Sequence, residues 1–420
     1  MLYSCDCLVL ITKGERRMRR HTIWLGILLI VLPIFASLVL QVEHAKAMNG
    51  WTEYASNPVF DPSVRAYYPW VLYDAGKFSG HGDSYYYKMW YGTGSTLRLA
   101  YSDDGIIWVE QGGDLSVLTN PHHPVVVYDS SGFAGSVYYK IWYWDSSSEY
   151  VNPIRYAESS DGITWINDQA ITEDPMSQLV TGWVSPYWFY SSYGPGAVLY
   201  NPSGYGSINN ADPMGNKYIM YYDACSQGSA PDGSVEATAL AYSADGKYWS
   251  RYGSEPVFKA GGGSTWDSDY AYVWTVLKIG GTYKMWYSGG QTDSNDGIGY
   301  AESTDGITWT RYASPIMLFT DGIAWRSGRT YTPRVIYDPN RFSGHGDDAY
   351  YKMWFTGVAA GNYAVGYAFI PAPPVSPPVG GEWVPIDPIQ MLAQIIGSAV
   401  AMSAIVASFV GLKRLKKRQN

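Results

Sequence analysis

The segment Tyr351-Lys352-Met353-Trp354-Phe355 is one of five copies of a five-residue pattern that decides the fold. The other copies cover residues 87–91, 139–143, 218–222 and 283–287. In an extended chain the first, third and fifth residues of each copy lie on one face and the second and fourth on the other, which is the period of a β-strand. Aromatic residues also favour strands over helices. The sequence therefore predicts five related β-sheet units.

A second pattern closes four of these units. The dipeptide Asp-Gly supplies the positive backbone angles of a tight turn, and the tryptophan three residues after each glycine is expected to pack between neighbouring sheets. The four turns are Asp104-Gly105, Asp161-Gly162, Asp245-Gly246 and Asp305-Gly306, and their tryptophans are Trp108, Trp165, Trp249 and Trp309.

The fifth unit lacks this turn and its last strand, since Tyr367-Ala368-Phe369 leads directly into Pro371. The missing strand has a counterpart at the other end of the repeats, where residues 51–58 (WTEYASNP) resemble residues 309–315 (WTRYASP). Five four-stranded units closed by this strand exchange predict an all-β fold, a five-bladed β-propeller over residues 48–370. The alternative is an open solenoid, which would need capping repeats and would gain nothing from a split unit.

The composition excludes several other classes of protein. Of the 420 residues, 16% are aromatic, which argues against a disordered chain, and only 16% are charged, which argues against a long coiled coil. The net charge is −8, although both ends of the chain are basic, so the middle is more acidic than the whole. An acidic domain repels phosphate backbones, and nucleic acid is therefore not expected as a partner.

Both ends of the chain are typical of a membrane protein. Basic residues precede the apolar run of residues 23–40, and Ala45-Lys46-Ala47 offers a cleavage site, so residues 1–47 are predicted to be a signal peptide or signal anchor. Met18 offers an alternative start.

At the other end, residues 389–412 are predicted to form a transmembrane helix, followed by a basic cytoplasmic tail over residues 413–420. A Pro-rich linker over residues 371–388 would join this helix to the propeller. Positive residues stay cytoplasmic, so the expected location is the cell membrane, with one C-terminal span and the propeller outside the cell.

Residues 51–370 resemble the five-bladed glycoside hydrolase superfamily that includes families 43, 32, 68 and 130. The pattern YKMWY followed by YAxSxDGxxW carries this resemblance, as in residues 283–309. It implies the scaffold of a sugar-active propeller. The Asp-Gly turn also resembles the Asp-box of sialidases, although it is one residue shorter. In both groups the turn is structural, so its aspartates are not expected to be catalytic.

Enzymes of families 43 and 32 use carboxylates that project from inner strands into the central funnel. One carboxylic acid protonates the leaving oxygen while a second carboxylate activates water or attacks directly. In family 43 the base is an aspartate directly before a proline of the first inner strand. The matching positions here, none of which holds a carboxylate, are Tyr68, His123, Pro195, Val273 and Thr332. The motifs of family 32 are also not found, so the resemblance extends to the fold and leaves the activity open.

The expected entrance of the funnel supplies the candidate site. Asp267 and Asp269 are two residues apart and share a face of extended chain, so they are the candidate acid and base; the alternative is an Asp-rich turn after Trp266. Aromatic rings stack on sugar C–H groups, while arginine and histidine bind hydroxyls or carboxylates. The candidate substrate-binding residues, which are incidental rim residues in the alternative interpretation, are Arg65, Tyr67, Tyr68, His122, His123, Tyr270, Arg329 and Tyr331.

No cofactor is predicted, with calcium left open. His122 and His123 are adjacent and would point to opposite faces of a strand, so they are not expected to share a metal ion. Two copies of Gly-His-Gly-Asp, at residues 80–83 and 344–347, could bind calcium through aspartate oxygens or form ordinary hairpins. Cys225 has no evident base beside it and is expected to be a small buried side chain rather than a nucleophile.

Together these features predict an extracellular, membrane-anchored propeller that binds glycans or processes them as a glycoside hydrolase. The alternative is a non-catalytic interaction or structural domain on the same scaffold. A third hypothesis, phosphorolysis as in family 130, would need a basic phosphate pocket, for which Arg65, Arg329 and Arg334 are available.

Overall fold

The computed structural model describes residues 50–94, 96–115, 117–133, 135–147, 154–171, 192–205, 216–226, 235–291 and 297–371. These residues form β-strands and four short 3-10 helices, with no α-helix among them. The predicted signal segment, linker, transmembrane helix and basic tail lie outside the described residues, apart from Pro371 at the end of the last strand. Within the described part of the chain, no helix is long and apolar enough to cross a membrane.

The strands form five blades, named here in chain order. Blade 1 contains β2 (Tyr67–Tyr73), β3 (Tyr87–Gly92), β4 (Leu97–Ser102) and β5 (Val109–Glu110). Blade 2 contains β6 (Pro121–Tyr128), β7 (Tyr139–Asp145), β8 (Ile154–Ser159) and β9 (Trp165–Ala170). Blade 3 contains β10 (Pro195–Tyr200), β11 (Tyr218–Cys225), β12 (Glu236–Ser243) and β13 (Ser250–Arg251).

Blade 4 contains β14 (Tyr270–Ile279), β15 (Thr282–Gly290), β16 (Gly297–Ser303) and β17 (Thr310–Arg311), with β18 (Met317–Leu318) also paired to β16. Blade 5 contains β19 (Arg329–Tyr337), β20 (Ala349–Ala359), β21 (Asn362–Pro371) and β1 (Thr52–Glu53). The 3-10 helices are η1 (Lys77–Gly80), η2 (Phe319–Asp321), η3 (Ala324–Arg326) and η4 (Arg341–Gly344).

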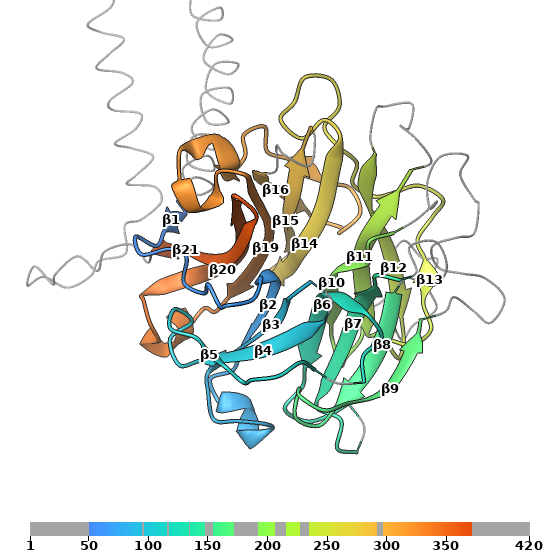
Figure 1. Ribbon diagram of the computed structural model, residues 1–420. Helices are drawn as coiled ribbons and strands as arrows, with labels where there is room; N and C mark the ends of the chain where they lie inside the picture. Colours follow the sequence, from blue (N-terminus) through green and yellow to red (C-terminus); the bar gives the residue numbers. More distant parts are fainter. Residues whose placement is uncertain are drawn as a thin grey trace, which may run out of the picture. The chain divides into compact units, whose positions relative to one another are not determined.

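The innermost strands of the blades form a closed ring. Strand β2 lies beside β6, β6 beside β10, β10 beside β14, β14 beside β19, and β19 beside β2 again (Figure 1). One parallel bridge, between Glu236 and Tyr270, joins blades 3 and 4. The chain is therefore a β-propeller with a central channel that is lined by these five strands.

The N-terminal strand completes the last blade, as the sequence predicts. Strand β1 pairs antiparallel with β21, with Thr52 opposite Phe369 and Glu53 opposite Ala368. Trp51 packs edge-on against Trp286 of blade 4, at 6.4 Å between ring centroids. The first described strand and the last are thus held in one sheet, which closes the ring.

The repeated pattern lies on the second strand of each blade and binds successive blades together. The indole Nε1 of Trp90 in blade 1 donates to the carbonyl oxygen of Gly162 in blade 2 at 3.0 Å. Trp354 in blade 5 makes the same bond to Gly105 in blade 1 at 2.8 Å. The Asp-Gly turn is therefore an inter-blade contact as well as a tight turn, and this agrees with the structural role expected for its aspartates.

The inner strands change register where they enter the channel, and this irregularity positions the site. Each inner strand has a shift in its pairing with the second strand of its blade. In three of them the residue directly before proline has a positive φ: Tyr68 (55°), His123 (46°) and Thr332 (58°). Non-glycine residues rarely adopt this conformation, which is uncommon before proline and tends to occur at functional sites.

Candidate functional site

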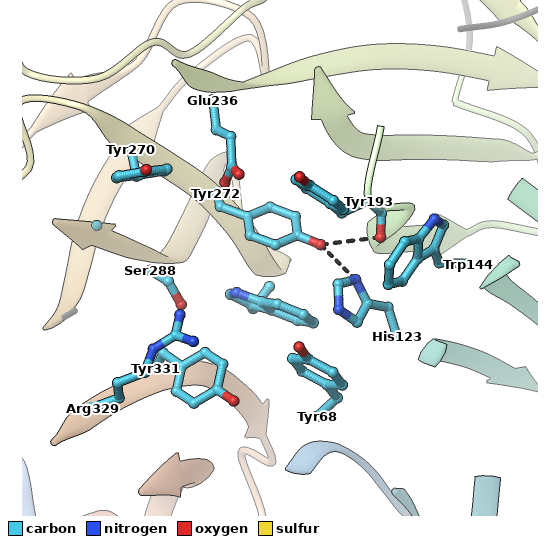
Figure 2. Close-up of a pocket in the computed structure, with 12 residues that line it drawn as sticks. Tyr68, His123, Trp144, Tyr193, Glu236, Tyr270, Tyr272, Ser288, Arg329 and Tyr331 are labelled. Atoms are coloured by element: carbon cyan, nitrogen blue, oxygen red, sulfur yellow. Dashed lines mark hydrogen bonds between the residues drawn. The ribbon is translucent and has the colours of Figure 1, made fainter. Parts of the chain in front are cut away.

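A cavity of about 240 Å³ lies at one end of the central channel. Its lining comes from all five blades and is mainly aromatic (Figure 2). The lining residues are Tyr68, His123, Trp144, Tyr193, Glu236, Tyr270, Tyr272, Trp274, Ser288, Gly289, Arg329 and Tyr331. It is somewhat smaller than the roughly 300 Å³ at which pockets for drug-sized ligands begin, so it fits a single ring better than a chain of rings.

Aromatic rings pack against one another along one side of the cavity. The rings of Tyr68 and Trp274 are stacked, with an interplanar angle of 10° and 5.4 Å between centroids. Tyr272 lies 4.7 Å from Trp274, and Tyr331 lies edge-on to Tyr68 at 5.9 Å. Because these rings come from blades 1, 4 and 5, the closed ring of blades fixes their relative positions.

His123 joins blade 2 to blade 4 across this end of the channel. Its Nδ1 lies 2.6 Å from the hydroxyl oxygen of Tyr272, which is also 3.3 Å from the carbonyl oxygen of Tyr193 (Figure 2). Burial lowers the pKa of His123 well below its usual value, and the nearby His122 adds to this effect. The imidazole is therefore neutral at ordinary pH. Its Nε2 is buried and has no hydrogen-bond partner among the described residues.

Asp223, which the sequence analysis missed, is a buried carboxylate next to Tyr193, a residue of the cavity lining. It is fully buried on β11, and its Oδ2 accepts hydrogen bonds from the Tyr193 amide at 2.9 Å and the Cys225 thiol at 3.1 Å. Its Oδ1 is buried without a partner among the described residues. Burial raises the pKa of Asp223 to about 7. A buried carboxyl group with such a pKa is a candidate for proton transfer.

The same sheet face carries a second carboxylate. Cys225 pairs with Glu236 across β11 and β12, and Asp223 is two residues from Cys225, so all three side chains lie on one face of blade 3. Glu236 lines the cavity, and its carboxylate points toward Tyr272 in Figure 2. Cys225 is buried, as predicted, but the structure places a carboxylate beside its thiol, which the sequence did not indicate.

The predicted substrate-binding residues fall into two groups. Five of them line the cavity: Tyr68, His123, Tyr270, Arg329 and Tyr331. The other three, Arg65, Tyr67 and His122, form a cluster next to it. Tyr67 lies 4.5 Å from Tyr68 and 6.2 Å from His122 between ring centroids, while the Arg65 guanidinium lies 5.1 Å from the ring of Tyr363.

Asp267 and Asp269 lie outside this lining. Asp267 is fully buried, with its Oδ2 2.8 Å from the Tyr287 hydroxyl and 3.1 Å from the Nε of Arg311. Asp269 accepts a hydrogen bond from the Ser268 hydroxyl at 2.7 Å. These contacts place Asp267 in an ion pair within blade 4 and give neither aspartate a position on the cavity. Their catalytic role stays a prediction without geometric support.

The remaining lining residues were missed, although the repeat contained a signal for several of them. The position directly after the five-residue pattern is occupied by Gly92, Trp144, Asp223, Ser288 and Thr356. Trp144 and Ser288 line the cavity, and Asp223 accepts a hydrogen bond from the amide of Tyr193, another lining residue. Variation at one position of an otherwise regular repeat could therefore have marked the site.

The Gly-His-Gly-Asp loops contact buried lysines. Asp83 lies 2.8 Å from Lys88 Nζ, and Asp347 lies 3.5 Å from Lys352 Nζ. The described residues contain no group of three or more histidine, cysteine, aspartate or glutamate side chains arranged to hold a metal ion. The two loop aspartates thus form ion pairs with Lys88 and Lys352.

No family model matches the sequence. A protein of Mycobacterium tuberculosis described as "Uncharacterized protein Rv1502" is 27% identical over 229 residues, which are 47% of this chain and 66% of that protein. The chain thus spans just under two thirds of the length of this relative.

Several solved structures resemble the chain over a larger part of its length than this relative does. A glycoside hydrolase structure covers 80% of this chain and 96% of its own, with a TM-score of 0.53 and 15% identity. A structure from Bacteroides ovatus, described as a candidate glycoside hydrolase, has a TM-score of 0.53 and 14% identity over 76% of this chain and 95% of its own. A structure from a study of the GH130 family of mannoside phosphorylases has a TM-score of 0.52 and 16% identity, with coverages of 76% and 92%. The chain therefore has the β-propeller fold of glycoside hydrolase-like proteins.

Proposed function

We propose that this propeller binds glycans and that one sugar unit occupies the cavity at the end of the channel. The observation that carries this proposal is the lining of the cavity, in which Tyr68, Trp274 and Tyr331 lie beside polar side chains. Sugar rings have apolar C–H faces and polar hydroxyl edges, so an aromatic wall with a few polar groups complements both.

The polar groups of the lining suit hydroxyl recognition. Glu236 accepts hydrogen bonds, Arg329 donates them, and Ser288 does both. Three further polar atoms are buried without partners among the described residues: Nε2 of His123 and Nε1 of Trp144 and of Trp274. A bound sugar or ordered water would satisfy such atoms, since a buried polar group without a hydrogen bond is costly.

The fold neighbours support a carbohydrate ligand without identifying it. One neighbour belongs to a study of hydrolases that target beta-1,2 mannosidic linkages, and another is described as a glycoside hydrolase. Each description applies to that protein only. The expected extracellular location is also part of this proposal, because glycans of cell surfaces and matrices would then be accessible.

Glycan-array screening of the purified chain, followed by calorimetry with the best ligand, would test the proposal. Trp274→Ala should weaken binding by roughly 5- to 150-fold, because the contact of a ligand with one aromatic ring typically contributes about 1–3 kcal/mol. A matched control is Trp108→Ala, which removes a tryptophan from an Asp-Gly turn between blades 1 and 5. If folded Trp274→Ala binds as tightly as the wild type, the cavity is not the glycan site.

Glycoside hydrolysis is the second candidate function, favoured by the two acidic residues of blade 3. Asp223, whose pKa is raised to about 7 by burial, would be the protonated acid, and Glu236 in the cavity lining would be the base or nucleophile. Aryl-glycoside hydrolysis should then fall at least a hundredfold in both Asp223→Asn and Glu236→Gln while sugar binding persists. Hydrolysis that survives both substitutions would show that Asp223 and Glu236 are not the acid and the base, and the absence of hydrolysis in the wild type would leave binding as the function of the cavity.

A further inference from the structure

A second cavity, of about 380 Å³, lies at the other end of the channel. Its walls are the later halves of the inner strands, and most of its side chains are apolar. The lining residues are Trp70, Leu72, Tyr73, Phe78, Val126, Val127, Tyr128, Val198, Leu199, Tyr200, Tyr205, Val276, Leu277, Lys278 and Arg334. None of them lines the first cavity, so the two are separate spaces.

Arg334 and Trp70 occupy equivalent positions, each directly after the proline of its inner strand. The guanidinium carbon of Arg334 lies 3.7 Å from the centroid of the Trp70 ring. Trp70 is fixed in turn, because its Nε1 donates to the carbonyl oxygen of Val126 at 2.7 Å. This stacked pair forms part of the wall of the second cavity, with the cation held against the indole.

Few groups among the described residues interact with the positive charge of Arg334. The side chain is only 8% exposed, and its guanidinium donates one hydrogen bond to the described residues, from Nε to the carbonyl oxygen of Val71 at 2.9 Å. No carboxylate among the described residues forms an ion pair with it, and burial lowers its pKa. Lys278, at the exposed rim, adds a second positive charge.

A buried cation without a counter-charge is costly, and buried charges are normally paired. The two terminal nitrogens of an arginine form a planar fork that matches a carboxylate. We propose that the second cavity binds an organic carboxylate, with its carboxylate on Arg334 and its apolar body against the valine, leucine and aromatic walls. This site is independent of glycan binding, since it shares no lining residue with the first cavity.

Calorimetry of the full-length chain with sodium benzoate and sodium octanoate tests the proposal. Benzyl alcohol and 1-octanol serve as neutral analogues, and acetate as an anion without an apolar body. We expect both carboxylates to bind at least tenfold more tightly than their neutral analogues and than acetate. Equal binding of benzoate and benzyl alcohol would overturn the proposal.

Two variants locate the site. Arg334→Met should reduce benzoate affinity at least tenfold, because it keeps a long apolar side chain on Trp70 but removes the charge. Leu277→Trp should fill the cavity and abolish binding while leaving Arg334 in place, which tests the site even if Arg334→Met does not fold. Arg329→Gln, which changes the arginine of the first cavity, is the matched control and should bind benzoate as the wild type does. Loss of binding in Arg329→Gln but not in the other two variants would place the anion in the first cavity and overturn the proposal.

Discussion

The Nδ1 of His123 and the hydroxyl of Tyr272 lie 2.6 Å apart and connect blade 2 with blade 4 beside the cavity. Both side chains are buried, at 3% and 9% exposure. The backbone of His123 has a φ of 46° and lies within the shift in register at the entrance to the channel. A local irregularity in one strand thus creates a contact between blades that are not neighbours in the ring.

Tyr272→Phe should lower the free energy of unfolding by about 1–3 kcal/mol, because it leaves the imidazole buried without its partner. Urea denaturation followed by tryptophan fluorescence measures this change. The control is Tyr248→Phe, since the Tyr248 side chain is 59% exposed and its substitution should change stability by less than about 0.5 kcal/mol. Equal stability of the two variants would show that the bond contributes nothing.

The raised pKa of Asp223 predicts a specific dependence of stability on pH. An unfolded aspartate has a pKa of about 3.9, whereas burial raises the pKa of Asp223 to about 7, so the folded chain binds more protons between these values. The contribution of Asp223 to stability is therefore greatest below about pH 4 and declines as the pH rises to about 7. The decline is at most about 4 kcal/mol, at 1.36 kcal/mol per pKa unit.

Urea denaturation of the wild type and of Asp223→Asn at pH 4.5, 6 and 8 measures this contribution. The variant should gain stability relative to the wild type as the pH rises. His123 also affects the pH dependence, in the opposite direction, because burial lowers its pKa and protonation at low pH opposes folding. Since both proteins contain His123, the difference between them reports mainly on Asp223. A difference that does not change with pH would contradict the prediction.

The fold was predictable because its contacts repeat. A regular pattern places Trp90 and Trp354 at the same position of two blades, and both make the same bond to an Asp-Gly turn. The similarity of residues 51–58 to residues 309–315 also predicted the pairing of β1 with β21. Such features can be found by comparing the sequence with itself, since each blade needs the same contact with the next.

The site was only partly predictable because its residues lie at positions where the five repeated units differ from one another. Tyr68 and His123 were expected at the entrance of the funnel, and both line the cavity. Asp223 was missed because its importance comes from burial and from the Tyr193 amide, which is 30 residues away in sequence. Asp267 was chosen from spacing alone, and its partner Arg311 lies on the last strand of blade 4. Spacing along one loop does not show which side chains face the channel.

Lys352 should strongly stabilise the interface between blades 5 and 1. It is fully buried, and its Nζ donates to the carbonyl oxygen of His345 at 2.6 Å and to the hydroxyl of Tyr87 in blade 1 at 3.1 Å. It also forms an ion pair with Asp347 at 3.5 Å. Lys352→Met would leave this carboxylate without its cation, and breaking a buried ion pair typically costs about 3–5 kcal/mol.

The matched control is Lys77→Met, because the ion pair of Lys77 with Asp103 is exposed to solvent and should contribute less than about 1 kcal/mol. Thermal and urea unfolding of both variants should show a large loss of stability for Lys352→Met and a small one for Lys77→Met. Similar losses of stability in the two variants would mean that the buried Lys352 does not stabilise the interface between blades 5 and 1.

The closing strand gives the last prediction. Glu53 on β1 accepts hydrogen bonds from Nε and Nη2 of Arg326 at 3.1 and 2.9 Å, and Arg326 is only 2% exposed. Since hydrogen bonds to charged groups contribute about 1.5–3 kcal/mol, Glu53→Gln should lower the free energy of unfolding by about that amount. It should also speed proteolytic cleavage near β1, because this two-residue strand pairs with a single strand, β21, among the described residues.

Asp114→Asn provides the comparison for this variant, because Asp114 pairs with Arg98 at 2.8 Å in a much more exposed position. Exposed pairs of this kind contribute less than about 1 kcal/mol, so its stability and cleavage rate should stay close to those of the wild type. Urea denaturation and limited proteolysis with mass spectrometry measure both quantities. If Glu53→Gln unfolds and is cleaved like the wild type, the backbone pairing of β1 with β21 is sufficient to close the ring, and the contact between Glu53 and Arg326 is not needed for it.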